Sequence, residues 1–189
     1  MAIDTRAALL KHAEFFIRTQ GYSAFSYADL ADCVGIRKAS IHYHFPRKDD
    51  LIQELLSSYR TQFHQDLRNF EANSTSPMER LRAYGERFAK SFDNHMLPFC
   101  CALAAERSAL PESIRSEVHK DFMFQLEWLT RIIGDGIAAG QLSETRPADE
   151  VAVSLLSALE GGSIIGWALQ ERRPVLAAFT AMLGTLELG

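Results

Sequence analysis

The residues best suited to bind a ligand lie in one short stretch, residues 37–44, which read RKASIHYH. This stretch joins two adjacent cations, Arg37 and Lys38, to a serine hydroxyl, a phenol and two imidazoles. Guanidinium, ammonium and hydroxyl groups hydrogen-bond phosphate oxygens and the edges of bases. The composition of this stretch therefore predicts binding to nucleic acid.

Helix geometry decides which of these side chains face outward. Ile41 and Phe45 are four residues apart, so a helix places both on one face, which we expect to be buried. Pro46 should end this helix. The outward face then carries Lys38, Ala39, His42 and Tyr43, with Ser40 and His44 at its flanks.

A second short helix is expected just before, over residues 27–34. Ser26 and Asp29 have the spacing of a capping box, so this helix should begin after Ser26. Gly35 can adopt the left-handed conformation that a sharp turn needs. Two helices joined by such a turn predict a helix-turn-helix whose second helix enters the DNA major groove.

The remaining sequence is helical in pattern, with breaks at proline and glycine and no clear strand alternation. We expect an all-α protein with an N-terminal three-helix DNA-binding domain at 1–47 and a C-terminal helical ligand-binding and dimerisation domain at 48–189. Helices are expected near residues 4–20, 27–34, 38–44, 48–71, 77–94, 99–108, 112–138, 148–170 and 174–187.

The charge is distributed as expected for a protein that touches DNA at one end. The 189 residues are 47% apolar, enough for a folded core, and carry a net charge of −4. Residues 1–50 contain seven Lys or Arg against six Asp or Glu, whereas residues 51–189 contain thirteen against eighteen. Phosphate should therefore be attracted to the N-terminal part and repelled elsewhere.

Several other classes are not supported. The N-terminus has Asp4 among its apolar residues, unlike a signal peptide, and the apolar segment Val151 to Gln170 contains Glu160 beside two glycines. We expect a cytoplasmic protein without a membrane span. No metal-ligand spacing occurs and no cofactor is implied; Cys33, Cys100 and Cys101 predict no disulfide framework, and a redox role of Cys100 or Cys101 stays open.

From about Thr5 to Tyr59 the sequence resembles the TetR family of bacterial regulators. The resemblance is carried by Gln20-Gly21-Tyr22, Ser26, Leu30-Ala31, Gly35-Ile36, Ile41 to Pro46, Lys48 and Leu51. It implies a homodimer whose two recognition helices enter successive major grooves of a palindromic operator in double-stranded DNA. It also implies that a small molecule bound in the C-terminal half releases the DNA.

The resemblance assigns roles residue by residue. Lys38, Ala39 and Ser40 would approach base edges or nearby phosphates, whereas Tyr43, His44 and Lys48 would contact phosphates. Two positions depart from the family: Arg37 replaces the usual capping Ser or Thr, and His42 replaces a common Tyr. The DNA-binding residues expected are Ser26, Arg37, Lys38, Ala39, Ser40, His42, Tyr43, His44 and Lys48.

Aromatic residues in the C-terminal half suggest a small, largely apolar effector. Tyr84, Phe88 and Phe92 repeat every four residues, which places them on one helix face. Ordinary core packing is the alternative for each of them. The effector-binding residues expected are Tyr84, Phe88, Phe92, His95, Phe99, Cys100, Phe122, Gln125 and Trp128.

The last two helices are expected to form the dimer interface. Gly161 and Gly162 each disfavour a helix interior by about 1 kcal/mol, so a close helix approach is the expected compensation. Packing within the chain alone is the alternative. The interface residues expected are Leu155, Leu159, Gly162, Ile165, Ala177 and Ala181.

Two other functions are alternatives to a ligand-responsive repressor. One is a small all-α enzyme and the other a protein-binding adaptor, each using the C-terminal aromatic cavity. Cys100 has His95 nearby but no identifiable third group to orient it. His42 and His44 point to different sides of their helix and cannot share a metal. We expect a regulator and not an enzyme.

Overall fold

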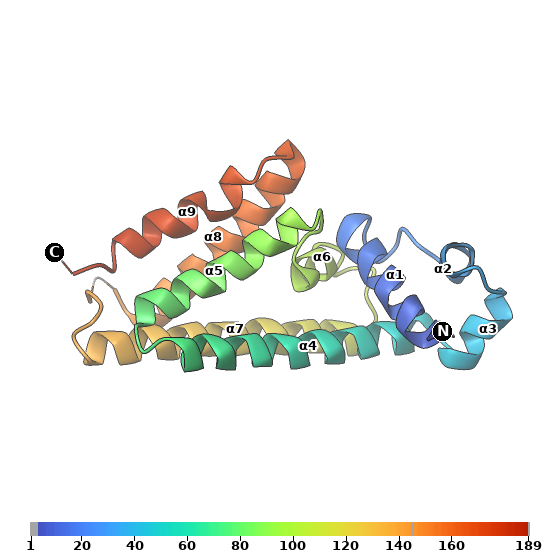
Figure 1. Cartoon of the computed structure of the whole chain (residues 1–189), viewed down its shortest axis with the longest axis horizontal. Helices are drawn as coiled ribbons and strands as arrows, with labels where there is room; N and C mark the ends of the chain where they lie inside the picture. Colours follow the sequence, from blue (N-terminus) through green and yellow to red (C-terminus); the bar gives the residue numbers. More distant parts are fainter. Residues whose placement is uncertain (1–3, 145, 189) are drawn as a thin grey trace. The chain divides into compact units, whose positions relative to one another are not determined.

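The computed structural model describes residues 4–144 and 146–188, and every regular element in these ranges is an α-helix (Figure 1). The all-α fold class is confirmed. The helix bounds follow the sequence expectation closely, with α6 and α9 each ending three residues early. The helices are α1 Thr5–Thr19, α2 Tyr27–Val34, α3 Lys38–His44, α4 Lys48–Asn73, α5 Pro77–Asp93, α6 Phe99–Ala105, α7 Glu112–Ala138, α8 Ala148–Leu169 and α9 Arg173–Gly184.

The described residues group into two compact units. The first contains residues 4–62 and 99–120, and the second contains residues 63–98 and 121–188. Helices α4 and α7 therefore each contribute to both units. The first unit extends beyond the expected N-terminal domain because α6 packs against α1. The domain boundary after residue 47 remains a prediction.

The first unit is built on α1, which packs against α2 and α6, while α2 packs against α3. Leu9, Ala13 and Ile17 recur every four residues on α1, and all three are buried. Asp4 caps α1, because its carboxylate accepts hydrogen bonds from the backbone N–H groups of the first turn. This unit contains the whole helix-turn-helix.

In the second unit α9 folds back along α8, and α5 packs against both (Figure 1). The closest approach is at Gly162, where an added Cβ would lie 2.5 Å from the Pro174 carbonyl oxygen. By contrast, a Cβ at Gly161 would meet nothing within 4 Å. Only the second glycine thus provides the expected close approach, and its partner is the chain's own α9.

Helix α8 is long and apolar enough to cross a membrane by length and composition. Burial in the second unit accounts for part of that composition, because Val151, Leu155 and Leu159 lie in the core. Leu155 and Leu159 are fully covered by the chain itself, and Gly162 is also buried. These three expected interface residues pack within the chain, which corrects their assignment as partner contacts.

Candidate functional site

The helix-turn-helix is fixed by short-range hydrogen bonds. Ser26 caps α2: the Ala28 N–H donates to Ser26 Oγ at 3.2 Å, and the Ser26 N–H donates to Asp29 Oδ2 at 2.7 Å. Bonds from the Ser26 side chain and backbone lower the pKa of Asp29, so this carboxylate is charged at neutral pH. Gly35 adopts φ 74° and ψ 35°, the left-handed conformation expected for the turn.

Helix α3 is anchored from behind by two buried side chains, Ile41 and Phe45, as expected. The Phe45 carbonyl oxygen accepts a 2.9 Å hydrogen bond from the Tyr27 hydroxyl of α2, and the Arg6 guanidinium lies 5.0 Å from the Phe45 ring centroid. Burial raises the pKa of Tyr27 to about 12. The buried face of α3 is thus fixed, and its opposite face is presented to solvent.

The side chains expected to face DNA lie on that solvent face. Tyr43 is 85% exposed, and its ring meets His44 edge-on at 5.3 Å. His42 is also exposed, yet its Nδ1 lies 3.2 Å from the Pro46 carbonyl oxygen and its ring packs edge-on against Tyr27. Lys38, Ala39 and Ser40 are exposed, and His44 is half-buried.

The two cations at the start of α3 are available to a ligand. Arg37 occupies the N-cap position with no side-chain capping bond, as its departure from the family pattern predicts. The side chains of Arg37 and Lys38 make no hydrogen bond or ion pair with another described residue. Arg47, in contrast, pairs with Asp50 at 2.9 Å.

The Lys48 ammonium binds groups within the chain, whereas the resemblance implies that it contacts a phosphate. Its ammonium donates to the Tyr22 and Phe25 carbonyl oxygens at 2.5 and 2.6 Å, and lies 4.4 and 3.9 Å from the centroids of the same two rings. Burial lowers the pKa of Lys48, although nearby carboxylates, first Glu106, oppose the shift. Sequence reasoning missed the part played by Tyr22 and Phe25, whose only signal was that both aromatic residues flank one short turn.

Most of the residues expected to bind an effector form a closed core in the second unit. Tyr84 is fully buried, its hydroxyl donates to Gln125 Oε1 at 2.7 Å, and its ring stacks on Trp128 with centroids 5.5 Å apart. The Trp128 Nε1–H donates to Glu71 at 2.8 Å. Phe88 is buried in the same core, with Phe92 and Phe122 packed against it.

The other three do not belong to that core. Phe99 and Cys100 are buried in the first unit, and His95 is exposed beyond the end of α5 with φ 54°. The expected effector residues are therefore divided between two units. Cys101 is buried as well, whereas Cys33 is exposed.

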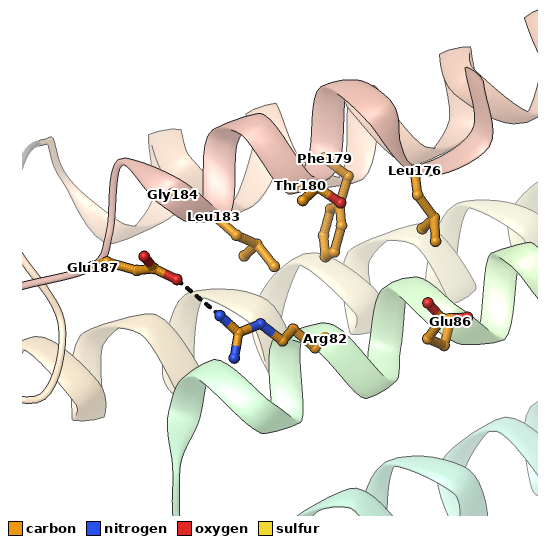
Figure 2. A pocket seen from close by; sticks show the side chains of 8 residues that line it. All are labelled: Arg82, Glu86, Leu176, Phe179, Thr180, Leu183, Gly184 and Glu187. Atoms are coloured by element: carbon orange, nitrogen blue, oxygen red, sulfur yellow. Dashed lines mark hydrogen bonds and ion pairs between the residues drawn. The ribbon is translucent and has the colours of Figure 1, made fainter. Parts of the chain in front are cut away.

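The second unit also has an open cleft of about 410 Å³ between α5 and α9, which sequence reasoning missed (Figure 2). Phe179 points from α9 toward α5, where Gly85 leaves room for its ring: an added Cβ would lie 2.4 Å from the ring. Arg82 pairs with Glu187 at 2.8 Å across the rim. The lining residues are Arg82, Glu86, Leu176, Phe179, Thr180, Leu183, Gly184 and Glu187.

No cluster of three or more His, Cys, Asp or Glu side chains that could hold a metal occurs within residues 4–144 and 146–188. The solvent-facing side of α3 carries cations, hydroxyls and aromatic rings on a short, firmly anchored helix.

Two family models match the chain. Residues 9–55 match the model described as bacterial regulatory proteins of the tetR family, and residues 77–182 match the tetracyclin repressor-like C-terminal domain. The chain belongs to the TetR family. TetR-family proteins are DNA-binding transcriptional regulators and not enzymes, so the matched helix-turn-helix, α2 and α3, is the DNA-binding element of the chain.

Solved structures of TetR-family proteins are similar to this chain over nearly its whole length. A TetR-family regulator from Agrobacterium tumefaciens has a crystal structure that matches with 34% identity and a TM-score of 0.93, over 97% of this chain and 98% of that chain. A TetR regulator from Legionella pneumophila matches with 25% identity and a TM-score of 0.88, over 99% and 100%.

Among characterised regulators, the chain is 23% identical to TtgR of Pseudomonas putida over 172 residues, 85% of this chain and 79% of TtgR. It is 27% identical to the transcriptional repressor KstR2 of Mycobacterium tuberculosis over 90 residues. That match spans 48% of this chain and 45% of KstR2, less than half the length of either protein.

Proposed function

We propose that this TetR-family protein is a ligand-responsive repressor that binds a palindromic operator as a homodimer and is released by a small, largely apolar effector. The observation that carries the proposal is the solvent-facing side of α3, where Lys38, Ser40 and Tyr43 stand opposite the buried Ile41 and Phe45. A firmly anchored helix with such a face suits the major groove. The repressor KstR2 among its relatives supports the sign of regulation. A cytoplasmic location follows from this function.

We propose the contacts with DNA from the position of each residue in the helix-turn-helix. Lys38, Ala39 and Ser40, in the first turn of α3, approach base edges, while Tyr43 and His44 approach phosphates. Ser26 adds the exposed N–H groups at the start of α2. Arg37 binds a phosphate or a guanine, and His42 supports the face from its contact with Tyr27.

For the dimer we rely on apolar side chains that the chain leaves uncovered. Val153, Ile164, Ile165 and Leu169 on α8 are between 42% and 59% exposed. Ala177 and Ala181 of α9 are exposed as well. A large exposed apolar face on a folded unit favours association with a second copy. Ile165, Ala177 and Ala181 therefore remain in the proposed interface.

The effector is proposed to bind the second unit. Its aromatic core offers polar anchors in the hydrogen bonds between Tyr84 and Gln125 and between Trp128 and Glu71, within a mostly apolar environment. An apolar effector that enters there would have to separate packed rings, so binding would necessarily change the structure of the unit.

Selection of bound duplexes from a random library by purified protein, at near-physiological salt, tests the proposal. A palindrome with half-sites one helical turn or more apart is expected to be enriched. Lys38→Ala should change the preferred bases, while its circular dichroism spectrum stays that of the wild type. Folded wild-type protein that enriches no sequence would contradict the proposal and favour a protein-binding adaptor.

A further inference from the structure

The turn between α1 and α2, residues 21–25, is held from two sides by side chains distant in sequence. On one side is Lys48, the first residue of α4, whose ammonium lies between the Tyr22 and Phe25 rings and binds both of their carbonyl oxygens. An ammonium has three N–H donors, and two of them are used here.

On the other side is Glu106, which directly follows α6. Its carboxylate accepts a 3.0 Å hydrogen bond from the Ser23 N–H. Gly21, at φ +102°, allows this approach, because an added Cβ would lie 1.9 Å from Glu106 Oε1. The carboxylate thus occupies the space that any side chain at Gly21 would need.

The turn leads straight into the DNA-facing surface. Ser26, the residue after it, caps α2 and lies beside the N–H groups proposed to meet a phosphate. Tyr27 follows, and its hydroxyl anchors the end of α3 through the Phe45 carbonyl oxygen. A shift of the turn would therefore displace both the start of α2 and the end of α3.

We infer that Lys48 and Glu106 are positioning residues for DNA binding, which hold the turn of residues 21–25 and thereby fix α2 and α3 against DNA. This inference rests on the proposed function. It assigns Lys48 an internal role in place of a phosphate contact. It also gives Glu106 a definite task, since withdrawal of this carboxylate would leave the Ser23 N–H without its acceptor and release the turn.

The test uses the full chain, with Glu106→Ala, Glu106→Gln and the control Glu112→Ala. Glu112 also belongs to the first unit, but its side chain is 81% exposed and pairs with Arg115. Hydrogen exchange of the Ser23 amide is measured on free protein, and operator affinity is measured from 50 to 200 mM salt. Thermal unfolding checks that each variant is folded.

Glu106→Ala should speed exchange at Ser23 and weaken operator binding by up to about tenfold, because one lost hydrogen bond to a charged group lowers the population of the ordered turn by at most about that factor. The dependence of affinity on salt should be unchanged, because no phosphate contact is lost. Glu106→Gln keeps an oxygen acceptor but loses the charge, so it should change both properties less than Glu106→Ala, whereas Glu112→Ala should retain both. Unchanged Ser23 exchange or affinity in Glu106→Ala would overturn the role of Glu106.

Lys48→Met and Lys48→Arg separate positioning from phosphate contact. If Lys48 holds the turn, both variants weaken binding without changing the salt slope, because a planar guanidinium does not fit the ammonium's place between two carbonyls and two rings. Combining Lys48→Met with Glu106→Ala should then cost less than the two changes added.

A salt slope reduced by about 0.9 in Lys48→Met, with binding retained in Lys48→Arg, would identify a phosphate contact and overturn the inference. Wild-type protein that selects no duplex would overturn the proposed function and with it this role in DNA binding. The exchange measurement on free protein would still report whether Glu106 holds the turn, so the two failures are distinguishable.

Discussion

Tyr43 extends from α3 with 85% of its surface exposed, so its side chain contributes little to the fold. We expect Tyr43→Ala to weaken operator binding by about tenfold, on all duplexes alike, because a phosphate hydrogen bond carries no base information. The salt slope should be unchanged, since the phenol is neutral. Fluorescence anisotropy with the selected operator and a scrambled duplex measures both effects. Tyr43→Phe is the matched variant, and equal affinity in wild type and Tyr43→Ala would exclude the contact.

Ionisation of another single side chain, that of Tyr27, should make the stability of the protein depend on pH. Burial raises its pKa from 10.0 to about 12, so the folded state holds the phenolic proton more tightly than the unfolded state. The stabilisation is fully present below pH 10 and is lost as the pH rises toward 12. The melting temperature of Tyr27→Phe should therefore fall less between pH 10 and pH 12 than that of the wild type. An identical pH profile in the variant would contradict the assignment.

Tyr27→Phe should also lower the free energy of unfolding at neutral pH by about 1 kcal/mol, because the Phe45 carbonyl oxygen loses its donor. Urea denaturation at pH 7 measures this separately from the alkaline effect.

At the scale of helices, the glycine pair of α8 gives two opposite expectations. Gly162→Ala should lower the free energy of unfolding by about 1–3 kcal/mol, because the new Cβ meets the backbone of α9 at Pro174 and Val175. Gly161→Ala meets open space and should stabilise α8 by up to about 1 kcal/mol. Chemical denaturation of both variants at one protein concentration makes the comparison. Equal effects would show that α8 and α9 do not approach as described.

The start of α3 lacks a side-chain cap, because Arg37 stands at its N-cap position with φ −80° and ψ 144°. Arg37→Ser should therefore raise the free energy of unfolding by about 1 kcal/mol. It should also weaken operator binding and reduce the salt slope by about 0.9 if Arg37 meets a phosphate. Arg37→Ala is the matched control, with the same loss of affinity but no gain in stability. A salt slope equal to that of the wild type would exclude the phosphate contact. Arg37 would then either contact a guanine or be exposed to solvent only.

The sequence predicted those features of the helices that depend on residues close together along the chain. The capping box joins Ser26 and Asp29, three residues apart, and the turn uses the left-handed conformation of Gly35. Longer-range contacts were not predictable, because no local pattern encodes them. Glu106 meets Ser23 across 83 residues, and the cleft of Figure 2 needs the pairing of α5 with α9. The same limit explains why one stripe on α8 mixed buried Leu155 with exposed Ile165.

For the whole molecule, an acidic net charge and a DNA-binding function are compatible because the charge is unevenly distributed. The net charge is −4, but residues 1–50 carry a net of +1. This N-terminal part, which contains the helix-turn-helix and is called the head below, neutralises few phosphates when it binds as a single copy. Two heads on one palindrome add their binding free energies, provided that the copies are joined. Operator affinity should therefore depend strongly on the association of two chains.

The exposed apolar face of α8 tests this dependence. Ile165 is 52% exposed, so Ile165→Glu should leave the fold intact while placing two like charges close together in a symmetric interface. We expect a monomer by light scattering and at least a tenfold loss of affinity for the palindrome. Binding to a single half-site should be unchanged, because the head is untouched. The matched control is Met123→Glu on α7, also in the second unit and 43% exposed. A dimeric Ile165→Glu variant with wild-type affinity would place the interface elsewhere, whereas a monomer that still binds the palindrome tightly would show that association is not what joins the two heads.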